Sequence, residues 1–476
     1  MKRLSLIGVG ITLVLALASL LVLVRLGAAP FWDYDEASYA QITHMMLTQH
    51  SVISQEYFHG PFLEKPPLYE WLAALSALAF GENEFAFRLP SALAGIALIG
   101  FTMLLAYALT RNSLAAFFSG AVLLTTSPVI ETARQMRIDV LVTLWIVLGA
   151  WAVVRAVQDK RYFLLFGVAL ALAIMTKSVV AFFALAALPL LLGWLGELRL
   201  LRSREVWGGV GVAFLLALPW HLIEFMRFGQ RFWQDYVVFN ITSRVRTDLF
   251  QLAPTTNRDY LWYLNNFALP WTQVFVLLFA PLVLWWRHIP RRIRAAIGFG
   301  ISMVALVSTV FFVSATKAPT YLVPLYPFAA LALGSAFAFL IEKARGPARI
   351  LCATIGTVLL VVGFCVTIYN GFHLNTAYYG KADALAREER EIATVIATRP
   401  ESRWLVFGDD RELGAIMYYA KRYDPAVLTS TTTLAVGDMV LMYQTKRPLF
   451  FAHYPFSTVA LMEGEQLILL EVVSED

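Results

Sequence analysis

The chain has 476 residues, of which 59% are hydrophobic and only 15% are charged. Soluble domains contain roughly 45–50% apolar residues, so this composition excludes a protein that is mostly in contact with water. The net charge of +5 at pH 7 is small for this length. Because no basic face is interleaved with base-stacking aromatic residues, the sequence indicates no nucleic-acid partner.

Eleven apolar runs of a length suited to a bilayer follow one another along the chain. A run of about 17–25 residues can cross a hydrocarbon core of roughly 30 Å as a helix that satisfies its own backbone hydrogen bonds. The runs lie at residues 4–26, 87–110, 114–131, 139–156, 161–176, 178–196, 206–225, 269–286, 295–315, 320–341 and 350–370. They predict an all-α polytopic membrane protein with about eleven transmembrane helices. The fifth and sixth runs are short and abut at Thr176 and Lys177, so they are expected to form a re-entrant pair or to break at a different point, which would change the number of helices.

The basic residues between these runs predict an orientation. Lysine and arginine are enriched in the cytoplasmic loops of membrane proteins, and here they gather in alternate connections, at residues 2–3, 111, 155–161, 199–204, 287–294 and 343–349. We therefore expect the N-terminus in the cytoplasm and the C-terminus outside. The first apolar run is longer than the 7–15 residues of a signal-peptide core, so it is predicted to be a retained anchor.

The composition changes after Tyr369. A charged helical stretch at 382–397 is followed by a strand at 404–407, a helix at 412–420 and strands at 439–443 and 467–473. This alternation predicts a small exterior α/β domain. The predicted division is a transmembrane domain at 1–370 and a soluble exterior domain at 371–476. The turn at 408–410 lacks the glycine pattern of a phosphate-binding loop, so no catalytic role is assigned to it.

Three connections on the exterior side, at residues 27–86, 131–139 and 226–268, are rich in polar and aromatic residues. From Glu36 to Leu47 the apolar residues recur at helical spacing, which predicts an amphipathic helix along the membrane surface. For any single tryptophan or tyrosine in these connections, anchoring at the interface is the simpler explanation.

Ionisable residues close to the membrane core are costly unless they are paired or hydrated. Asp35 and Glu36 follow the first run, Asp139 begins the fourth, and Lys317 lies between the ninth and tenth. Ion pairs that hold helix ends together would explain these residues. They would equally suit a reaction in which a carboxylate takes a proton from an acceptor while cations hold an anionic phosphate leaving group.

An ordered set of motifs extends over residues 30–330. In chain order it comprises Asp35-Glu36 with Tyr39-Ala40, Glu64-Lys65-Pro66-Pro67-Leu68-Tyr69, Gly81-Glu82-Asn83-Glu84-Phe85 with Arg88-Leu89-Pro90-Ser91-Ala92, Arg137-Ile138-Asp139, Thr176-Lys177, Pro219-Trp220, and Lys317-Ala318-Pro319-Thr320-Tyr321-Leu322 with Pro324-Leu325-Tyr326-Pro327. The set resembles the polyprenyl-phosphate sugar transferases of the GT-C class. It is most similar to the bacterial branch that contains the lipid A aminoarabinose transferases and relatives of the protein O-mannosyltransferases.

The resemblance implies roles for particular residues. Asp35 is the expected base and Asp139 a second catalytic carboxylate, while Lys65, Lys317 and Tyr321 are expected to hold the lipid phosphate. The other residues expected at the substrate are Glu36, Arg88, Arg137 and Arg244. Glu64 matches a position associated with a divalent metal ion, but a glutamate beside a lysine is as readily an ion-pair partner, so no cofactor is predicted with certainty.

Two positions depart from the family pattern. Ser38 stands where family members often carry arginine, so one phosphate contact is expected to be either absent or supplied by Arg88 or Arg137. Asn240 stands where a histidine is usual, which weakens the case for a metal ion in that loop.

The function implied by the resemblance is transfer of a sugar from a polyprenyl-phosphate carrier to lipid A, another glycan or a protein, at the exterior face of a bacterial inner membrane. One displacement at the anomeric carbon would invert it. The main alternative is a transporter or flippase of a lipid-linked solute, in which the charges would line a pathway. No internal repeat of the kind found in transporters is visible in the sequence. A third alternative is an inactive scaffold, against which the presence of both carboxylates and Lys65 argues.

Overall fold

The structure is a computed structural model that describes residues 2–31, 34–57, 60–243, 246, 256–370, 379–407, 414–422, 425–428 and 432–475. The chain forms two compact units. The first comprises residues 1–26, 63–72 and 88–372, and the second comprises residues 27–62, 73–87 and 373–476. Helix α3 (Leu68–Phe80) leads from the first unit into the second, and α4 (Glu84–Thr110) leads back. The domain division after residue 370 stays a prediction.

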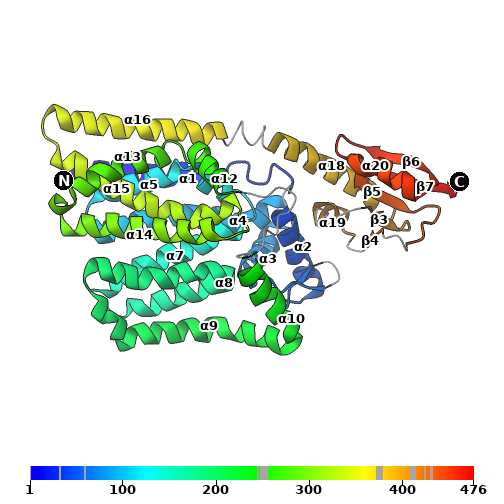
Figure 1. The fold of residues 1–476 in the computed structure, drawn as a ribbon, viewed down its shortest axis with the longest axis horizontal. Coiled ribbons are helices and arrows are strands. Elements are labelled where there is room, and N and C mark those ends of the chain that lie inside the picture. Colours follow the sequence, from blue (N-terminus) through cyan, green and yellow to red (C-terminus); the bar gives the residue numbers. More distant parts are fainter. Residues whose placement is uncertain are drawn as a thin grey trace. The chain divides into compact units, whose positions relative to one another are not determined.

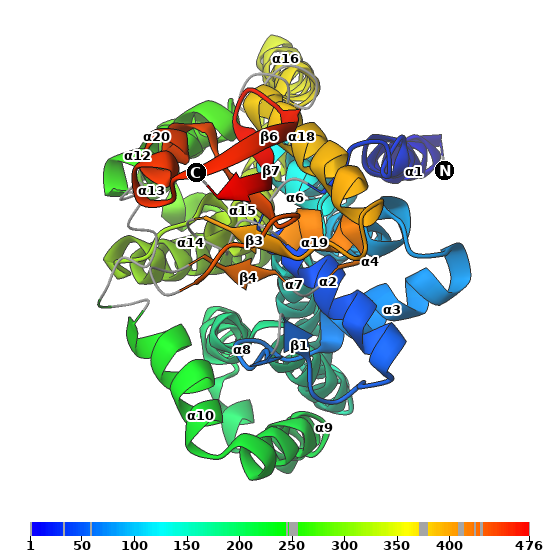
Figure 2. The ribbon, with the colours of Figure 1, turned by 90° about the vertical axis from the view of Figure 1, so that its right-hand side faces the viewer.

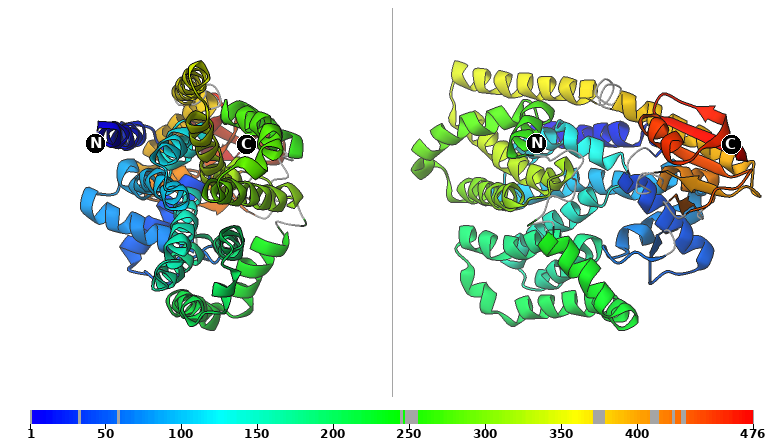
Figure 3. Two further views of the ribbon diagram at one scale, coloured as in Figure 1. Left: turned by 90° about the vertical axis from the view of Figure 1, so that its left-hand side faces the viewer. Right: turned by 45° about the vertical axis from the view of Figure 1, so that its right-hand side comes forward.

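The described part of the first unit is helical. Besides α4 it contains α1 (Lys2–Leu23), α5 (Ser113–Leu124), α6 (Ser127–Ala133), α7 (Ile138–Ala156), α8 (Tyr162–Leu195), η1 (Leu198–Arg202), α9 (Arg204–Phe228), α10 (Gln230–Phe232), the π-helix η2 (Trp233–Ser243), α12 (Asn257–Phe267), α13 (Trp271–Leu284), η3 (Trp286–His288), α14 (Arg291–Val313), η4 (Pro319–Leu325), α15 (Tyr326–Lys343) and α16 (Pro347–Tyr369). The long helices lie side by side along one common direction (Figure 1), and the left panel of Figure 3 views them nearly end-on.

The lengths and surfaces of these helices suit a lipid bilayer. Among the described residues, seven helices are long and apolar enough to cross a membrane, and nine if each of two bent pairs is one span. Large apolar side chains are exposed on them, such as Leu215 and Met226 of α9 at 73% and 82%. Such surfaces are stable in hydrocarbon and unfavourable in water. The predicted all-α polytopic membrane fold is confirmed.

Helix α8 contains the break expected between the fifth and sixth apolar runs. As one straight helix its 34 residues would extend roughly 51 Å, well beyond a hydrocarbon core. The backbone of Lys177 is non-helical, with φ −157° and ψ 87°, and divides the helix into two halves.

The contacts of the two halves show that they run in opposite directions. The first half packs against α7. The ring of Tyr162 contacts the ring of Trp151 near the end of α7, and Lys177 forms an ion pair with Asp139 at the start of α7. The second half returns along α14, with Phe183 on Phe311 and the Leu195 carbonyl accepting a hydrogen bond from Arg291. The two segments on either side of Lys177 are therefore antiparallel, and the number of membrane crossings they make stays a prediction.

The predicted span at 114–131 is divided into two helices, because α5 and α6 meet at a bend of 67°. The helical hydrogen bonding stops at Thr125 and Thr126, whose hydroxyls bond back to the carbonyls of Ala121 and Val122. Pro128 then occupies the first turn of α6. Proline has no N–H to continue the preceding helix and is pre-organised for a new first turn, which explains the bend.

The second unit contains a five-stranded mixed sheet. Its strands are β3 (Trp404–Val406), β4 (Ala426–Val427), β5 (Met439–Tyr443), β6 (Phe456–Glu463) and β7 (Leu467–Glu475), in the order β4-β3-β5-β7-β6. Strand β3 is parallel to β4 and β5, and β7 is antiparallel to β5 and β6. The predicted strands and helices of a small α/β domain are confirmed, and β4, β6 and α20 (Arg447–His453) are additional.

Helices cover both faces of this sheet (Figure 2). Residues that alternate along a strand point to opposite faces. Trp404 and Val406 therefore pack with α18 (Tyr379–Ala397) and α19 (Gly414–Ala420), whereas Leu405 packs with Phe450 of α20.

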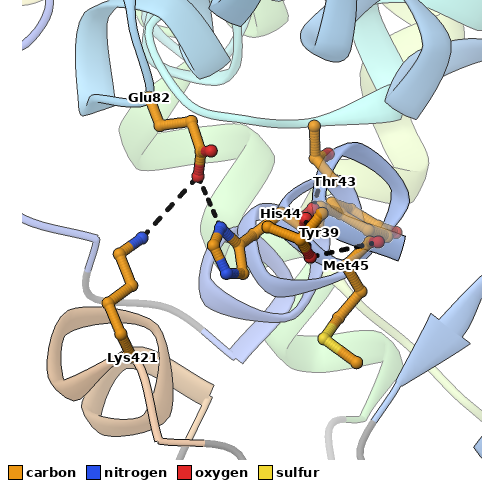
Figure 4. Close-up of polar contacts among 7 residues, drawn as sticks. Tyr39, Thr43, His44, Met45, Glu82 and Lys421 are labelled. Atoms are coloured by element: carbon orange, nitrogen blue, oxygen red, sulfur yellow. Dashed lines mark hydrogen bonds and ion pairs between the residues drawn. The ribbon is translucent and has the colours of Figure 1, made fainter. Parts of the chain in front are cut away.

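The second unit also includes the loop that follows the first helix. It contains α2 (Tyr34–Gln49) and the two-residue strands β1 (Glu56–Tyr57) and β2 (Gly60–Pro61). Glu82 accepts a hydrogen bond from His44 of α2 at 2.6 Å and lies 3.7 Å from Lys421, which follows α19 (Figure 4). The Tyr419 hydroxyl donates to Glu84 and accepts from the Phe31 backbone. These contacts tie the C-terminal region to α2, the helix that carries Asp35.

The alternating basic connections predict on which side of the membrane a reporter fused to the C-terminus lies. A reporter that is active only outside the cytoplasm is expected to be active when fused after Asp476, because an odd number of spans places the two termini on opposite sides. The same reporter inserted after Glu197, beside the arginines of η1, is expected to be silent and serves as the control. A silent C-terminal fusion together with an active insertion would reverse the predicted orientation.

Candidate functional site

The site is built around a largely buried ion pair at the start of α7, whose side chains are 6% exposed at Asp139 and 16% exposed at Lys177. Asp139 lies in the first turn of α7 and is 4% exposed, and its Oδ1 lies 2.7 Å from the Nζ of Lys177. The same ammonium lies 4.7 Å from the ring centroid of Tyr321, which provides a cation–π contact. The break in α8 makes this possible, because an unwound backbone at position 177 presents the lysine at the helix ends instead of to lipid.

Lys317 is fixed in the turn that leads to Tyr321. It is 7% exposed, and its ammonium donates a hydrogen bond to the carbonyl of Ser314 at the end of α14. The phenol of Tyr260 secures the next residue, accepting from the N–H of Ala318 at 2.9 Å and donating to its carbonyl at 3.0 Å. The structure therefore places two of the predicted residues, Lys317 and Tyr321, on one ordered turn.

The Arg137-Ile138-Asp139 motif is held by backbone contacts. The Ser91 hydroxyl donates to the carbonyl of Arg137 at 2.8 Å and accepts from the N–H of Arg137 at 3.1 Å. The Tyr69 hydroxyl lies 2.8 Å from the same Ser91 oxygen. Two other motif residues thus position the entry of α7, which explains why Tyr69 and Ser91 accompany the charged residues in the sequence pattern.

The arginines of this region stabilise the end of α1. Arg88 is 4% exposed and donates to the carbonyl of Leu26 at 3.1 Å. Arg134 donates to the carbonyls at residues 21, 22 and 24. The last carbonyls of a helix lack intrahelical partners, and a cation there also interacts favourably with the helix dipole. This structural role accounts for Arg88 without a phosphate contact.

The Glu64-Lys65 pair precedes α3. Both residues are partly buried, and the backbone carbonyl of Glu64 accepts a hydrogen bond of 2.7 Å from Asn240 of η2. The amide of Asn240 also donates to the Asp235 carbonyl at 3.1 Å. Asn240, which replaces the histidine usual in the family pattern, therefore serves to position the Glu64-Lys65 segment.

The adjacent carboxylates Asp35 and Glu36 differ in exposure. Both lie in the first turn of α2. Glu36 is completely buried, whereas Asp35 is partly exposed. A general base must approach the proton it removes, so the exposed carboxylate is the better candidate. Along α2, burial is not confined to one stripe, since Gln41 and Thr43 are buried together with Ala40 and Ile42.

A chain of hydrogen bonds lies beside the break in α8. The Tyr236 hydroxyl contacts Ser178 and lies 2.6 Å from Nε2 of His221. Nδ1 of His221 lies 2.8 Å from the Ala217 carbonyl, which only accepts, so in the neutral ring Nε2 accepts from Tyr236. Burial raises the pKa of the Tyr236 phenol, which keeps it a donor. This chain of hydrogen bonds fixes Ser178, the residue that follows Lys177.

Lys177, the partner of Asp139, is not among the residues predicted at the site. The signal that identifies it is a single lysine between two apolar runs, since an intramembrane cation requires a partner. The predicted residue Arg244 lies outside the described residues. The structure brings together Asp139 and Tyr321 through Lys177, with Lys317 on the same turn as Tyr321.

Glu64 occupies the position that the resemblance associates with a divalent metal ion. Within the described parts of the chain, no group of three or more His, Cys, Asp or Glu side chains is arranged to hold a metal ion. The metal role of Glu64 stays a prediction.

Comparisons with known proteins confirm the resemblance. A family model described as dolichyl-phosphate-mannose-protein mannosyltransferase matches residues 64–223. This segment contains the Glu64-Lys65 pair, the ordered entry of α7 and Lys177. The chain thus resembles the GT-C class of polyprenyl-phosphate sugar transferases, as its motifs predicted.

Individual relatives indicate which members of this class the chain is similar to. The chain is 28% identical over 324 residues to the undecaprenyl phosphate-alpha-4-amino-4-deoxy-L-arabinose arabinosyl transferase of an Enterobacter species, covering 65% of this chain and 56% of the relative. It is 30% identical over 398 residues to arabinosyl transferase 2 of the same description from Pseudomonas fluorescens, covering 78% and 63%. The matches therefore span less than two thirds of the length of these relatives.

Solved structures share the fold. The crystal structure of ArnT from Cupriavidus metallidurans bound to undecaprenyl phosphate matches with a TM-score of 0.72 and 19% identity, over 96% of this chain and 97% of that one. An oligosaccharyltransferase from Archaeoglobus fulgidus matches with a TM-score of 0.54 and 11% identity, over 93% and 70%. The fold, including the C-terminal α/β region, is of the GT-C type.

Proposed function

We propose that this protein is a glycosyltransferase of a bacterial inner membrane that moves a sugar from a polyprenyl-phosphate carrier to an acceptor at the exterior face. The observation that supports it most is the cluster of the buried Asp139 with the partly buried Lys177 and Tyr321. Burying charges costs several kcal/mol per ion. If the only role of these residues were to hold two helices together, apolar side chains would do so at a lower cost in free energy. A largely buried ammonium against Tyr321, on the turn that also carries Lys317, is instead suited to an anionic group.

The cations would act on the leaving group. In the displacement, an acceptor oxygen attacks the anomeric carbon, the bond from that carbon to the phosphate oxygen breaks, and the lipid phosphate leaves with the electron pair. Ammonium groups placed where this charge develops stabilise the transition state more than the ground state. Lys65, Lys177 and Lys317 are the proposed phosphate ligands, with Tyr321 as a hydrogen-bond donor.

The base would take the acceptor proton. The resemblance assigns this role to Asp35, and its exposure relative to Glu36 supports that choice. Asp139 is paired with Lys177 and therefore has a different proposed task, which is to orient the ammonium. Arg137 is proposed to contact the substrate near the entry of α7.

The names of the relatives suggest the donor. We infer a sugar carried on undecaprenyl phosphate, with an amino-arabinose as the first candidate and lipid A as the first candidate acceptor. In the proposed orientation the N-terminus lies in the cytoplasm and the C-terminus outside.

The proposal is tested at Lys65 with purified protein and a synthetic polyprenyl-phosphate sugar. Lys65→Ala removes a charge-assisted contact to phosphate worth roughly 1.5–3 kcal/mol, so transfer is expected to fall about tenfold or more. Lys160→Ala is the matched control, because Lys160 is an exposed lysine in the connection between α7 and α8. It is expected to transfer at the normal rate.

Wild-type transfer by the Lys65→Ala protein would remove Lys65 from the phosphate site. If the wild-type protein moves the lipid across liposomes and transfers its sugar to no acceptor, the flippase alternative replaces the proposal.

A further inference from the structure

A cavity of about 760 Å³ lies in the first unit, far from the cluster of Lys177. It is bounded by the end of α4, the starts of α5, α14 and α16, and the end of α15. Helix α14 begins at this cavity and ends shortly before Lys317, and its 23 residues extend roughly 34 Å. The cavity is therefore at the opposite ends of the helices from the candidate functional site.

The wall of the cavity is strongly basic. Arg111, Arg291, Arg292 and Arg349 line it, and Glu342 is the only acidic residue among its lining residues. Arg291 donates to the Leu195 carbonyl. In the described structure, the guanidinium groups of Arg111, Arg292 and Arg349 have no hydrogen-bond or ion-pair partner within 4 Å. Three cations around one cavity repel one another, so an anion between them would lower the energy of the arrangement.

Backbone groups add to this positive potential. Helices α5 and α14 both begin at the cavity, with Ser113 and Arg291 as their first residues. The N-terminal end of a helix carries a partial positive charge, although at α5 the Asn112 side chain already accepts from the N–H groups of Leu114 and Ala115. Thr110 and Asn112 provide further polar atoms in the lining. These features together suit an anionic phosphate group better than an uncharged apolar ligand.

The remainder of the wall is apolar. Leu114, Ile293, Ile341 and Ala353 line the cavity beside the arginines. Helix α16, which contributes Arg349 and Ala353, exposes Ile350 and Leu351 at 71% and 59%. A ligand with an anionic head and a long apolar tail could place both parts here, which a soluble anion could not.

We propose that this cavity binds the phosphate headgroup of an anionic phospholipid, whose acyl chains lie along the apolar face of α16. In the proposed orientation it faces the cytoplasmic leaflet. The site is separate from the one that takes the polyprenyl phosphate, and it would anchor the ends of five helices through one shared lipid.

The test uses the full-length protein in detergent, with native mass spectrometry of bound lipid. Phosphatidylglycerol is expected to be retained at least about tenfold more than the zwitterionic phosphatidylcholine. The variant R111Q/R292Q/R349Q is expected to lose at least about tenfold of this retention, since each arginine near a lipid phosphate contributes measurably. The control R161Q/R202Q/R204Q removes the same charge from exposed arginines of the same face, away from the cavity, and should retain phosphatidylglycerol.

A second variant tests the cavity without changing charge. Ala353→Trp fills the space beside Arg349 and is expected to displace phosphatidylglycerol as well. Unchanged retention in both the triple variant and Ala353→Trp would overturn the proposal. So would displacement of phosphatidylglycerol by millimolar inorganic phosphate, because the ligand would then be a free anion and the apolar wall would contribute nothing.

Discussion

Replacing Asp35 with Asn is expected to lower the turnover of sugar transfer by about 10²–10⁴-fold, which is the usual contribution of a general base. The substitution keeps nearly the same volume and leaves a hydrogen-bonding group, but it removes the basic oxygen that would take the proton from the acceptor. The loss should therefore appear in the rate of the chemical step, while protein yield and binding of the lipid donor stay near normal. Transfer and donor binding are measured on the same purified protein.

The neighbouring carboxylate provides the matched control for this substitution. Glu36 is completely buried, so Glu36→Gln is expected to change stability more than the chemical step. A variant Glu36→Gln that folds and binds the donor but does not turn over, beside an active Asp35→Asn, would show that the base is Glu36. The enzyme class would survive that result, since either carboxylate supports the same displacement.

Breaking the ion pair of Asp139 and Lys177 is expected to have the second large effect, on both stability and transfer. Lys177→Met leaves the Asp139 carboxylate buried without its cation, which typically costs about 3–5 kcal/mol of folding stability. Removing a group that stabilises the developing phosphate charge typically costs a further 10²–10³-fold in rate. Thermal unfolding in detergent and the transfer assay measure the two effects.

The double variant D139N/K177M separates a structural role from a functional one. It removes both charges, so the unfolding temperature is expected to return close to that of the wild type. Transfer is expected to stay low, because the phosphate ligand is absent. If transfer recovers together with stability, the pair serves only to hold α7 against α8.

The pair of Lys160 and Glu205 is the control for these effects. Its atoms are 3.8 Å apart and its side chains are 51% and 41% exposed. Exposed pairs contribute roughly 0–1 kcal/mol because water screens them. Lys160→Met is therefore expected to leave both unfolding and transfer nearly unchanged.

The amino-acid sequence by itself determined the features that depend on local composition. Apolar runs of bilayer length identify helices because a spanning segment must satisfy its own backbone in lipid, whatever its neighbours are. The succession of helical and strand-like segments after Tyr369 likewise predicted β3, β5 and β7, since short apolar runs between polar segments favour buried strands. The motif residues were recognised through their order along the chain, which requires no knowledge of contacts.

Only the tertiary structure decided which charges meet. Lys177 and Asp139 are 38 positions apart, and their pairing depends on the break in α8 and on the packing of its first half against α7. The bend between α5 and α6, the burial of Glu36 beside the exposed Asp35, and the use of Arg88 at the end of α1 also arise from long-range packing. Hydropathy reports the solvent that a segment prefers, whereas the partner of a buried charge is set by which helices lie side by side and by the need to compensate that charge away from water.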